Sequence, residues 1–189
     1  MEFHLVYKGR LKGQKPGKDH VFEVRREFHP QLKELWNQEP LKNLKKDSLS
    51  PTPTEGEISV LKRSGQFTFA PLACQGLALH AKLNILFLRP APPGSLFDHG
   101  GDIDNRVKTL IDALRIPSEG EIPKDSKPEE GENPFFCLLE DDKLVTAFSV
   151  TTDRLLTAKQ KNHQPQDCQI VIQVILKPWR GQWNNMGLA

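Results

Sequence analysis

The chain has 189 residues and a formal net charge of +2 at pH 7, and 37% of its residues are hydrophobic. This length suits a single domain, which can bury a core without disulfides or a structural metal. A charge so close to zero excludes a polybasic tail as the basis of function. Any affinity for nucleic acid must therefore come from local basic patches.

Cysteine usage and the lack of long apolar runs indicate where the protein works. Cys74, Cys137 and Cys168 lie far apart, without the paired spacing of a zinc site, and indicate reduced thiols. The N-terminal residues form no apolar leader, and no stretch of the sequence reaches the length of a membrane span. We therefore expect a cytoplasmic protein that does not associate with membranes.

The first third of the chain predicts a strand, a basic loop, a short helix and a second loop. Residues 3–8 alternate in polarity with period two, as in a strand, and a glycine-containing basic loop follows. Pro30 suits the first turn of a helix that Pro40 ends. Residues 45–57, rich in Lys, Ser, Pro and Thr, are expected to form a flexible, exposed loop.

The middle of the chain predicts a hairpin, a strand and an amphipathic helix. The hairpin is expected to turn at Ser64 and Gly65. Alternation over residues 77–87 predicts the strand. The helix is expected over residues 105–115, and its apolar stripe has the spacing i, i+3, i+4, i+7. The stripe consists of Val107, Leu110, Ile111 and Leu114.

The last third predicts two strands separated from the helix by a long loop. Residues 117–134 are polar, acidic and rich in proline, so we expect a flexible loop there. The sequence predicts strands over residues 144–152 and 168–178. The second strand is expected inside the sheet, because both its faces are apolar. Residues 178–189 are expected to form an irregular tail. The order of elements predicts one α+β domain over residues 1–189, with a mixed β-sheet and helices packed mainly on one face.

Two aspartates stand immediately before the amphipathic helix. Asp102 and Asp104 are two residues apart, so in extended chain their carboxylates point the same way and could meet one cation. The alternative is helix capping, because acids in the first turn favour the helix dipole. Lys108 and Asp112 follow at one-turn intervals, on the side we expect opposite the apolar stripe. Lys108 could contact a phosphate or form an ion pair with Asp104.

A second acidic cluster, Glu140, Asp141 and Asp142, lies where a loop meets a strand. Like charges about 4 Å apart repel by roughly 4 kcal/mol at an effective dielectric constant of 20, and a divalent cation would remove that repulsion. Period two would place Glu140 on the same side as Asp142 and turn Asp141 away. An EF-hand is excluded, because Arg106, Val107 and Ala113 occupy its required positions.

Both clusters together resemble the signature of the RusA-type Holliday-junction resolvases. The resemblance comprises an Asp-x-Asp-Asn-x-x-Lys motif, an Asp-Ala-Leu run in the helix that follows it, and a later Asp-Asp pair before an apolar strand. The matching residues are Asp102, Asp104, Asn105, Lys108, Asp112, Ala113, Leu114, Asp141 and Asp142. They cover about the central quarter of the chain.

The resemblance implies a RusA-like fold and a homodimeric, magnesium-dependent endonuclease that cuts four-way DNA junctions in recombination and repair. It implies metal ligation by Asp102, Asp104 and Asp142, with Asp141 and Glu140 as secondary candidates, and a catalytic role for Lys108. Mn²⁺ is a possible substitute for Mg²⁺. Two alternatives stay open: a non-catalytic DNA-binding module, and a metal-dependent nuclease for another DNA structure.

Phosphate contacts require Lys and Arg side chains. The candidates in the two basic loops are Arg10, Lys12, Lys15, Lys18, Lys42, Lys45 and Lys46, of which we favour Arg10, Lys12, Lys15, Lys45 and Lys46. The acidic stretch 117–134 would repel DNA unless it points away from the site. Trp179 and Trp183 could stack on unpaired bases, but we expect them to pack on the protein body or on a partner subunit.

Overall fold

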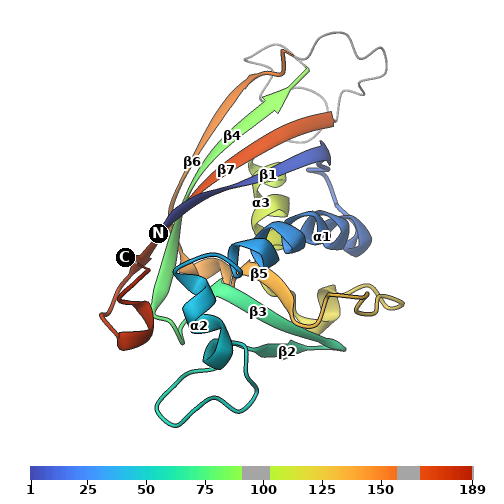
Figure 1. Ribbon diagram of the computed structural model, residues 1–189. Coiled ribbons are helices and arrows are strands. Elements are labelled where there is room, and N and C mark those ends of the chain that lie inside the picture. The colour runs from blue at the N-terminus through green and yellow to red at the C-terminus, as the bar shows by residue number, and fades with distance from the viewer. Residues whose placement is uncertain (91–102, 157–166, 189) are drawn as a thin grey trace.

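The computed structural model describes residues 1–90, 103–156 and 167–188, which form three α-helices, seven strands and three short 3-10 turns (Figure 1). The helices are α1 (Lys18–Leu35), α2 (Leu41–Ser48) and α3 (Ile103–Leu114). The strands are β1 (Glu2–Arg10), β2 (Lys62–Ser64), β3 (Phe67–Ala73), β4 (Leu79–Arg89), β5 (Phe135–Leu139), β6 (Val145–Arg154) and β7 (Asp167–Pro178). The 3-10 turns are η2 (Glu119–Glu121), η3 (Asp142–Leu144) and η4 (Trp183–Asn185).

The larger sheet has four strands in the order β1-β7-β4-β6. β7 pairs antiparallel with both β1 and β4, whereas β6 runs parallel to β4 at the edge of the sheet. The predicted alternation of β4 is confirmed, because Leu83 and Ile85 are buried while Asn84 faces out. The interior position predicted for β7 is also confirmed, since β1 and β4 pair with its two edges.

A second sheet has the order β2-β3-β5, so the single mixed sheet expected from the sequence is in fact two sheets. The predicted hairpin is present as β2 and β3, but its turn lies one residue later, at Gly65 and Gln66, with Gly65 at a φ of +55°. β5, every residue of which is buried, pairs parallel with β3 and was not predicted as a strand. Its continuous apolar run lacks the alternation by which strands are recognised.

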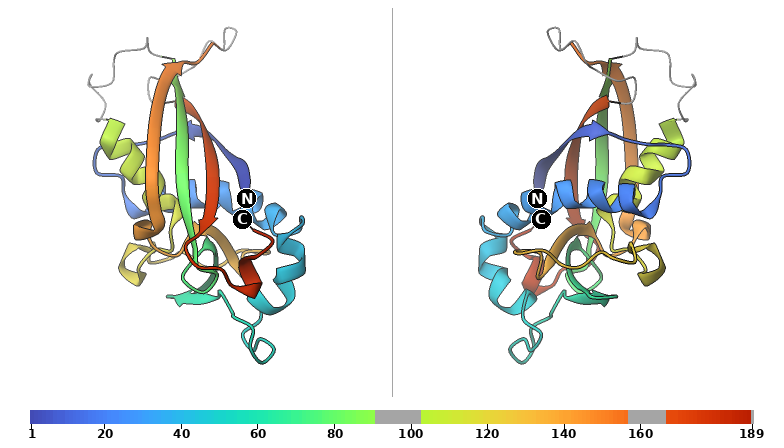
Figure 2. Two further views of the ribbon diagram at one scale, coloured as in Figure 1. Left: turned by 90° about the vertical axis from the view of Figure 1, so that its left-hand side faces the viewer. Right: turned by 90° about the vertical axis from the view of Figure 1, so that its right-hand side faces the viewer.

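The helices lie on one side of the four-stranded sheet, and the other face is uncovered (Figure 2). α1 contacts β1, β5 and α3, so it joins the two sheets. The main hydrophobic core includes residues of both sheets and of all three helices. The general class predicted from the sequence, α+β with mixed strand pairing, is therefore confirmed. No helix in the described part of the chain is long and apolar enough to cross a membrane.

The first helix is longer than expected, because Pro30 lies inside α1 and not at its start. The buried stripe of α1, which includes Val24, Phe28 and Leu32, continues across the proline. Pro30 itself is exposed. Burial of the stripe therefore outweighs the loss of one N–H group to the helix, which local signals at the proline could not indicate.

The loop expected over residues 45–57 begins inside a helix, so that expectation is wrong for its first four residues. α2 starts directly after Pro40, and residues 45–48 form its second half. Leu41 is fully buried and Leu44 packs against the core, which is the one-turn spacing of an amphipathic helix. The lysines around these leucines, Lys42, Lys45 and Lys46, hid the pattern in the sequence.

The acidic segment 117–134 is anchored to α1, which counts against the flexible loop that we expected. Arg26 binds the Glu132 carboxylate through its Nε atom at 2.9 Å, and Glu132 is only 6% exposed. The Lys33 ammonium group donates to the Gly131 carbonyl at 2.9 Å. A buried carboxylate with a guanidinium partner fixes the backbone around it.

His29 connects α1 with this acidic segment and with β5, and we expect it to make stability depend on pH. Its Nδ1 atom accepts the Phe136 N–H at 2.9 Å, and its Nε2 atom lies 3.2 Å from the Gly131 carbonyl oxygen. Burial lowers the pKa of His29, and likewise that of His20. The folded protein thus binds these protons more weakly than the unfolded chain, so stability is full above about pH 6.5 and falls as the pH drops below it.

The expected result is a loss of up to about 1.4 kcal/mol per pH unit per histidine in the free energy of unfolding below that pH. The variant His29→Leu should lose about 1–3 kcal/mol at pH 7.5, because leucine offers no acceptor to the buried Phe136 N–H, and should show a weaker pH dependence. Urea unfolding at pH 7.5 and 5.5 measures both quantities. An unchanged pH dependence in the variant would contradict the assignment to His29.

Candidate functional site

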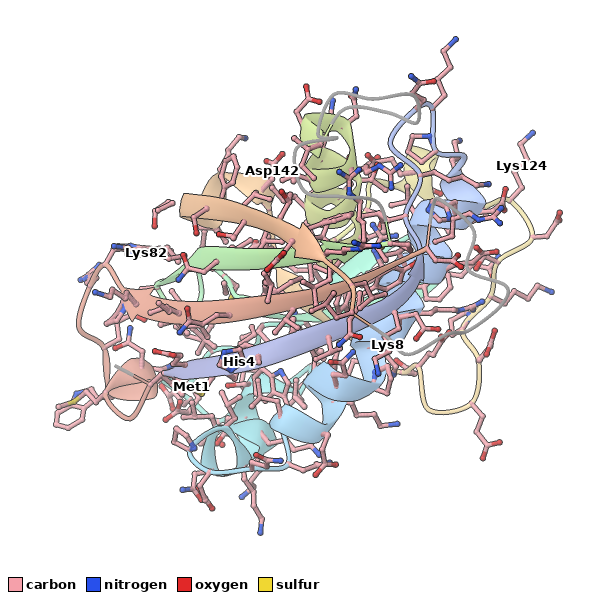
Figure 3. The ribbon with its side chains drawn as sticks, turned by 90° about the horizontal axis from the view of Figure 1, so that it is seen from above. Met1, His4, Lys8, Lys82, Lys124 and Asp142 are labelled. Atoms are coloured by element: carbon pink, nitrogen blue, oxygen red, sulfur yellow. The ribbon has the colours of Figure 1, made fainter. Side chains whose placement is uncertain are left out.

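A cleft of about 520 Å³ lies between α3 and the segment formed by η3 and β6. Its polar lining comprises Asp104, Lys108, Asp112, Asp142 and Lys143. Its apolar lining comprises Ile103, Val107, Ile111, Val145, Phe148 and Val150. Figure 3 shows Asp142 between the beginning of β6 and α3. The cleft therefore contains three of the four side chains that the sequence predicted to be catalytic. The fourth, Asp102, lies outside the described residues.

α3 contributes the polar row Asp104, Lys108 and Asp112 because these residues are spaced one helical turn apart. We expected the row to lie opposite the apolar stripe, but Val107 and Ile111 line the same cleft as the row. The fully buried side of α3 lies elsewhere and includes Leu110 and Ala113. The row is thus at the boundary between core and solvent, where charged groups face a partly apolar wall.

Lys108 is exposed and has no ion-pair partner among the described residues, so the predicted alternative, an ion pair with Asp104, is not formed. Asp112 is engaged differently, because its Oδ1 atom lies 3.0 Å from the Arg115 guanidinium. Asp104 is also exposed, and its Oδ1 atom accepts the Asn105 N–H at 2.8 Å. The ammonium group of Lys108 can therefore serve an anionic ligand in the cleft.

The three consecutive acids after β5 point to different places. Glu140 pairs with Lys62 at 3.2 Å and accepts the Gln75 N–H at 2.8 Å. Asp141 caps η3 by accepting the Lys143 N–H at 2.9 Å, and this bond lowers the pKa of its carboxyl group. Of the three, only Asp142 lines the cleft.

These positions disfavour Glu140 and Asp141 as secondary metal ligands. The expectation for Glu140 depended on strand periodicity through residues 140–142. The 3-10 turn that starts at Asp142 breaks that periodicity, and Lys62, from a strand of the other sheet, binds Glu140 instead.

Asp104 and Asp142 are the carboxylates in the cleft that could hold a divalent cation. No three His, Cys, Asp or Glu side chains of residues 1–90, 103–156 and 167–188 come together in the manner of a metal site. The predicted trio requires Asp102, so its convergence stays a prediction. The donor set itself suits Mg²⁺, which prefers carboxylate oxygens and retains several water ligands.

The first basic loop packs against α3. The hydroxyl group of Thr109 donates to the Lys12 carbonyl at 3.1 Å, and the Lys12 N–H donates to His20 Nε2 at 3.1 Å. A Cβ atom on Gly13 would lie only 2.8 Å from Cγ of Arg106, so glycine permits this close approach. The loop that carries the candidate phosphate contacts Lys12 and Lys15, and that directly follows Arg10, therefore lies beside the helix that carries Asp104.

The second pair of basic candidates lies elsewhere. Lys45 and Lys46 are on α2, which lies at the other end of the molecule from the N-terminal end of α3 (Figure 1). The Lys45 ammonium group donates to Asn37 Oδ1 at 2.6 Å. Their position does not support a role for these two lysines in binding DNA at the cleft.

Acidic side chains of segment 117–134 are neutralised by arginines. Glu121 binds Arg115 at 2.6 Å, which lowers the pKa of the Glu121 carboxyl group to about 2. Arg26 pairs with Glu129 at 2.8 Å as well as with Glu132. These ion pairs reduce the repulsion of DNA that the composition of the segment would otherwise produce.

Phe148 is a cleft residue that we did not single out in the sequence. Its register partner is the buried Leu83, so it lies on the helix side of β6, yet its side chain is 58% exposed because it borders the cleft. The alternation of Phe148 and Val150 with polar neighbours predicts one apolar face of the strand. It does not reveal that α3 leaves part of this face uncovered.

The fold and the cleft together define an α+β protein with a site in which a helix and the start of an edge strand present carboxylates and a lysine. Comparison of the chain with protein-family models, with curated proteins and with solved structures finds no match. The resemblance to RusA-type resolvases thus stays a prediction from the sequence motif.

Proposed function

We propose that this protein is a magnesium-dependent endodeoxyribonuclease that cuts branched DNA, with the four-way junction as its most favoured substrate. One observation supports this proposal most. Asp104 and Lys108 of α3 and Asp142, which is 34 residues further along the chain than Lys108, line one cleft. The motif that predicted these residues required such a meeting.

In this proposal each cleft residue has a separate task. Asp104 and Asp142, with Asp102 as the predicted third ligand, hold Mg²⁺. When bound there, the ion would supply positive charge at the scissile phosphate and would lower the pKa of a water molecule. Lys108 binds a phosphate oxygen or the leaving oxygen as a point charge. The basic loop beside α3, through Lys12 and Lys15, holds the phosphate backbone on either side of the cut.

Symmetrical cutting of a four-way junction requires two sites related by a two-fold axis, so we propose a homodimer. Sedimentation equilibrium of the purified protein measures this directly. A protein that stays monomeric both alone and on junction DNA would exclude paired cutting, although it would leave single-strand nicking possible.

The test of the proposed activity uses labelled four-way, flap and linear duplex DNA of the same sequence, with Mg²⁺, with Mn²⁺ and with EDTA. We expect cleavage of the junction with either metal ion, little cleavage of the duplex and none in EDTA. Equal cutting of all three substrates would support a nuclease of another specificity. Cutting in EDTA would contradict the metal-dependent mechanism.

A non-catalytic DNA-binding module is the second candidate. It is favoured by the position of Asp104 in the first turn of α3, since an acidic residue there stabilises the helix without any catalytic role. This candidate predicts junction binding with no product under any metal condition. It also predicts that Asp104→Asn binds DNA as well as the original chain does.

A further inference from the structure

The residues that follow β7 form an ordered tail, which is fixed to the body of the protein. The buried Asn185 side chain donates to the carbonyl groups of Leu77 and Arg180, each at 2.8 Å. Leu188 is fully buried, and its carbonyl accepts a bond from the Met1 amino group at 2.6 Å. Side chains on this tail are therefore held in defined positions.

This fixed tail exposes large apolar side chains. Trp183 is 89% exposed, Met186 66% and Trp179 48%. Seven large hydrophobic side chains are exposed in the described residues, and these three of them lie within a stretch of eight residues. We expected both tryptophans to pack on the body or on a partner subunit, and Trp183 does not pack on the body. Grouped exposure of this kind marks an interaction site.

Basic side chains lie beside Trp179, the first of the exposed tryptophans. Trp179 stacks on His80 with ring centroids 6.3 Å apart and 12° between the ring planes. His80 pairs across the strands with Lys177, and Lys82 follows His80 on the same uncovered face of β4. Arg180 directly follows Trp179 and is exposed. The acid Glu2, on the outermost strand β1, is already engaged, because its carboxylate accepts a hydrogen bond from Gln173.

We propose that this surface, which we term the tail platform, binds single-stranded nucleic acid. The tail platform consists of His80, Lys82, Lys177, Trp179, Arg180 and Trp183. Unpaired bases stack on the tryptophan rings, and the backbone phosphates pair with the lysine and arginine side chains. Lys82 and Lys177 distinguish this surface from a protein-binding one, because tryptophan and arginine are enriched in protein–protein interfaces whereas lysine is depleted from them.

The tail platform lies at the same end of the sheet as the candidate cleft. Val145, at the start of β6, pairs with Ala81, and the chain neighbours of Ala81 are His80 and Lys82. Asp142 is three residues before Val145. Figure 3 shows Asp142 and Lys82 at this end with β6 between them, and Lys124 on the far side of the molecule. An unpaired strand that leaves the cleft around the sheet edge would meet the tail platform.

The proposed binding does not depend on cleavage, so the experiment uses the full chain in EDTA. A fluorescently labelled 20-nucleotide thymidine oligomer is titrated with protein, and its anisotropy gives the dissociation constant. We expect Trp183→Ala and Trp179→Ala each to weaken binding about tenfold, and Trp183→Phe to retain most of it, because stacking requires an aromatic ring. Lys177→Gln and Arg180→Gln should reduce the salt dependence of binding.

Two matched controls carry exposed side chains far from the tail platform. Leu156, 86% exposed, matches Trp183, and Lys124 matches Lys177, so Leu156→Ala and Lys124→Gln should bind as the original chain does. No oligomer binding, or equal weakening by the controls, would overturn the proposal. Unchanged binding by Trp183→Ala, with loss of self-association in sedimentation, would instead identify a contact with a second copy. Asp142→Asn should bind the oligomer normally, so loss of cleavage and loss of this binding are distinguishable.

Discussion

Replacing Asp142 or Asp104 with asparagine is expected to lower junction cleavage by at least about 100-fold and to weaken the uptake of Mg²⁺ and Mn²⁺. Each change removes one negative charge and leaves the shape of the side chain almost unaltered. Both carboxylates are exposed at the cleft, so the free energy of unfolding should change by less than about 0.5 kcal/mol. A loss of activity therefore reports on the site and not on folding. Isothermal titration calorimetry with Mn²⁺ and single-turnover cleavage assays measure the two effects.

The chain provides a matched control for this experiment. Asp153 is exposed on β6. Its Oδ1 atom accepts the N–H of the next residue, Arg154, at 2.6 Å, in the same way as Oδ1 of Asp104 accepts the N–H of Asn105. Asp153 lies on the uncovered face of the sheet, so Asp153→Asn should cut and bind metal normally. If Asp104→Asn behaves like this control, Asp104 acts only at the start of the helix and the proposed metal site is incorrect.

Replacing Lys108 with methionine should lower the cleavage rate by about 100- to 1,000-fold while metal uptake and DNA affinity stay nearly the same. Removal of one charged group that stabilises a transition state has an effect of this size. Methionine keeps the length of the side chain and its apolar stem, so packing against the cleft wall is retained. Lys108→Arg should restore only part of the rate, since guanidinium and ammonium groups present their donors differently.

Lys143 is the appropriate comparison for Lys108, because it lines the same cleft and carries the same charge. Its side chain is 87% exposed and lies 3.9 Å from the Asp141 carboxylate. We expect Lys143→Met to change the Michaelis constant at most a few-fold and to leave the turnover number unchanged. Equal losses in turnover number for both variants would mean that the cleft uses net charge alone, and would remove the specific role proposed for Lys108.

Much of the fold could be predicted from local patterns. The alternation in β4 and the apolar run of β7 indicated their positions in the sheet, because burial of one or both faces determines the residue pattern of a strand. The errors share one cause. Pro30 inside α1, the lysine-rich α2 and the uniformly apolar β5 all carry local signals that distant packing partners override.

The candidate site shows the same division between sequence and structure. The sequence by itself determined that Asp104, Lys108 and Asp112 share one side of a helix, because helical spacing places residues four apart on one face. Only the tertiary structure decided that Asp142 lies in the same cleft while Glu140 binds Lys62 on the other sheet. Strand pairing between β4 and β6 fixes the position of Asp142. The residues that pair in this way are 60 or more positions apart, and contacts at such separations leave no periodic pattern in the sequence.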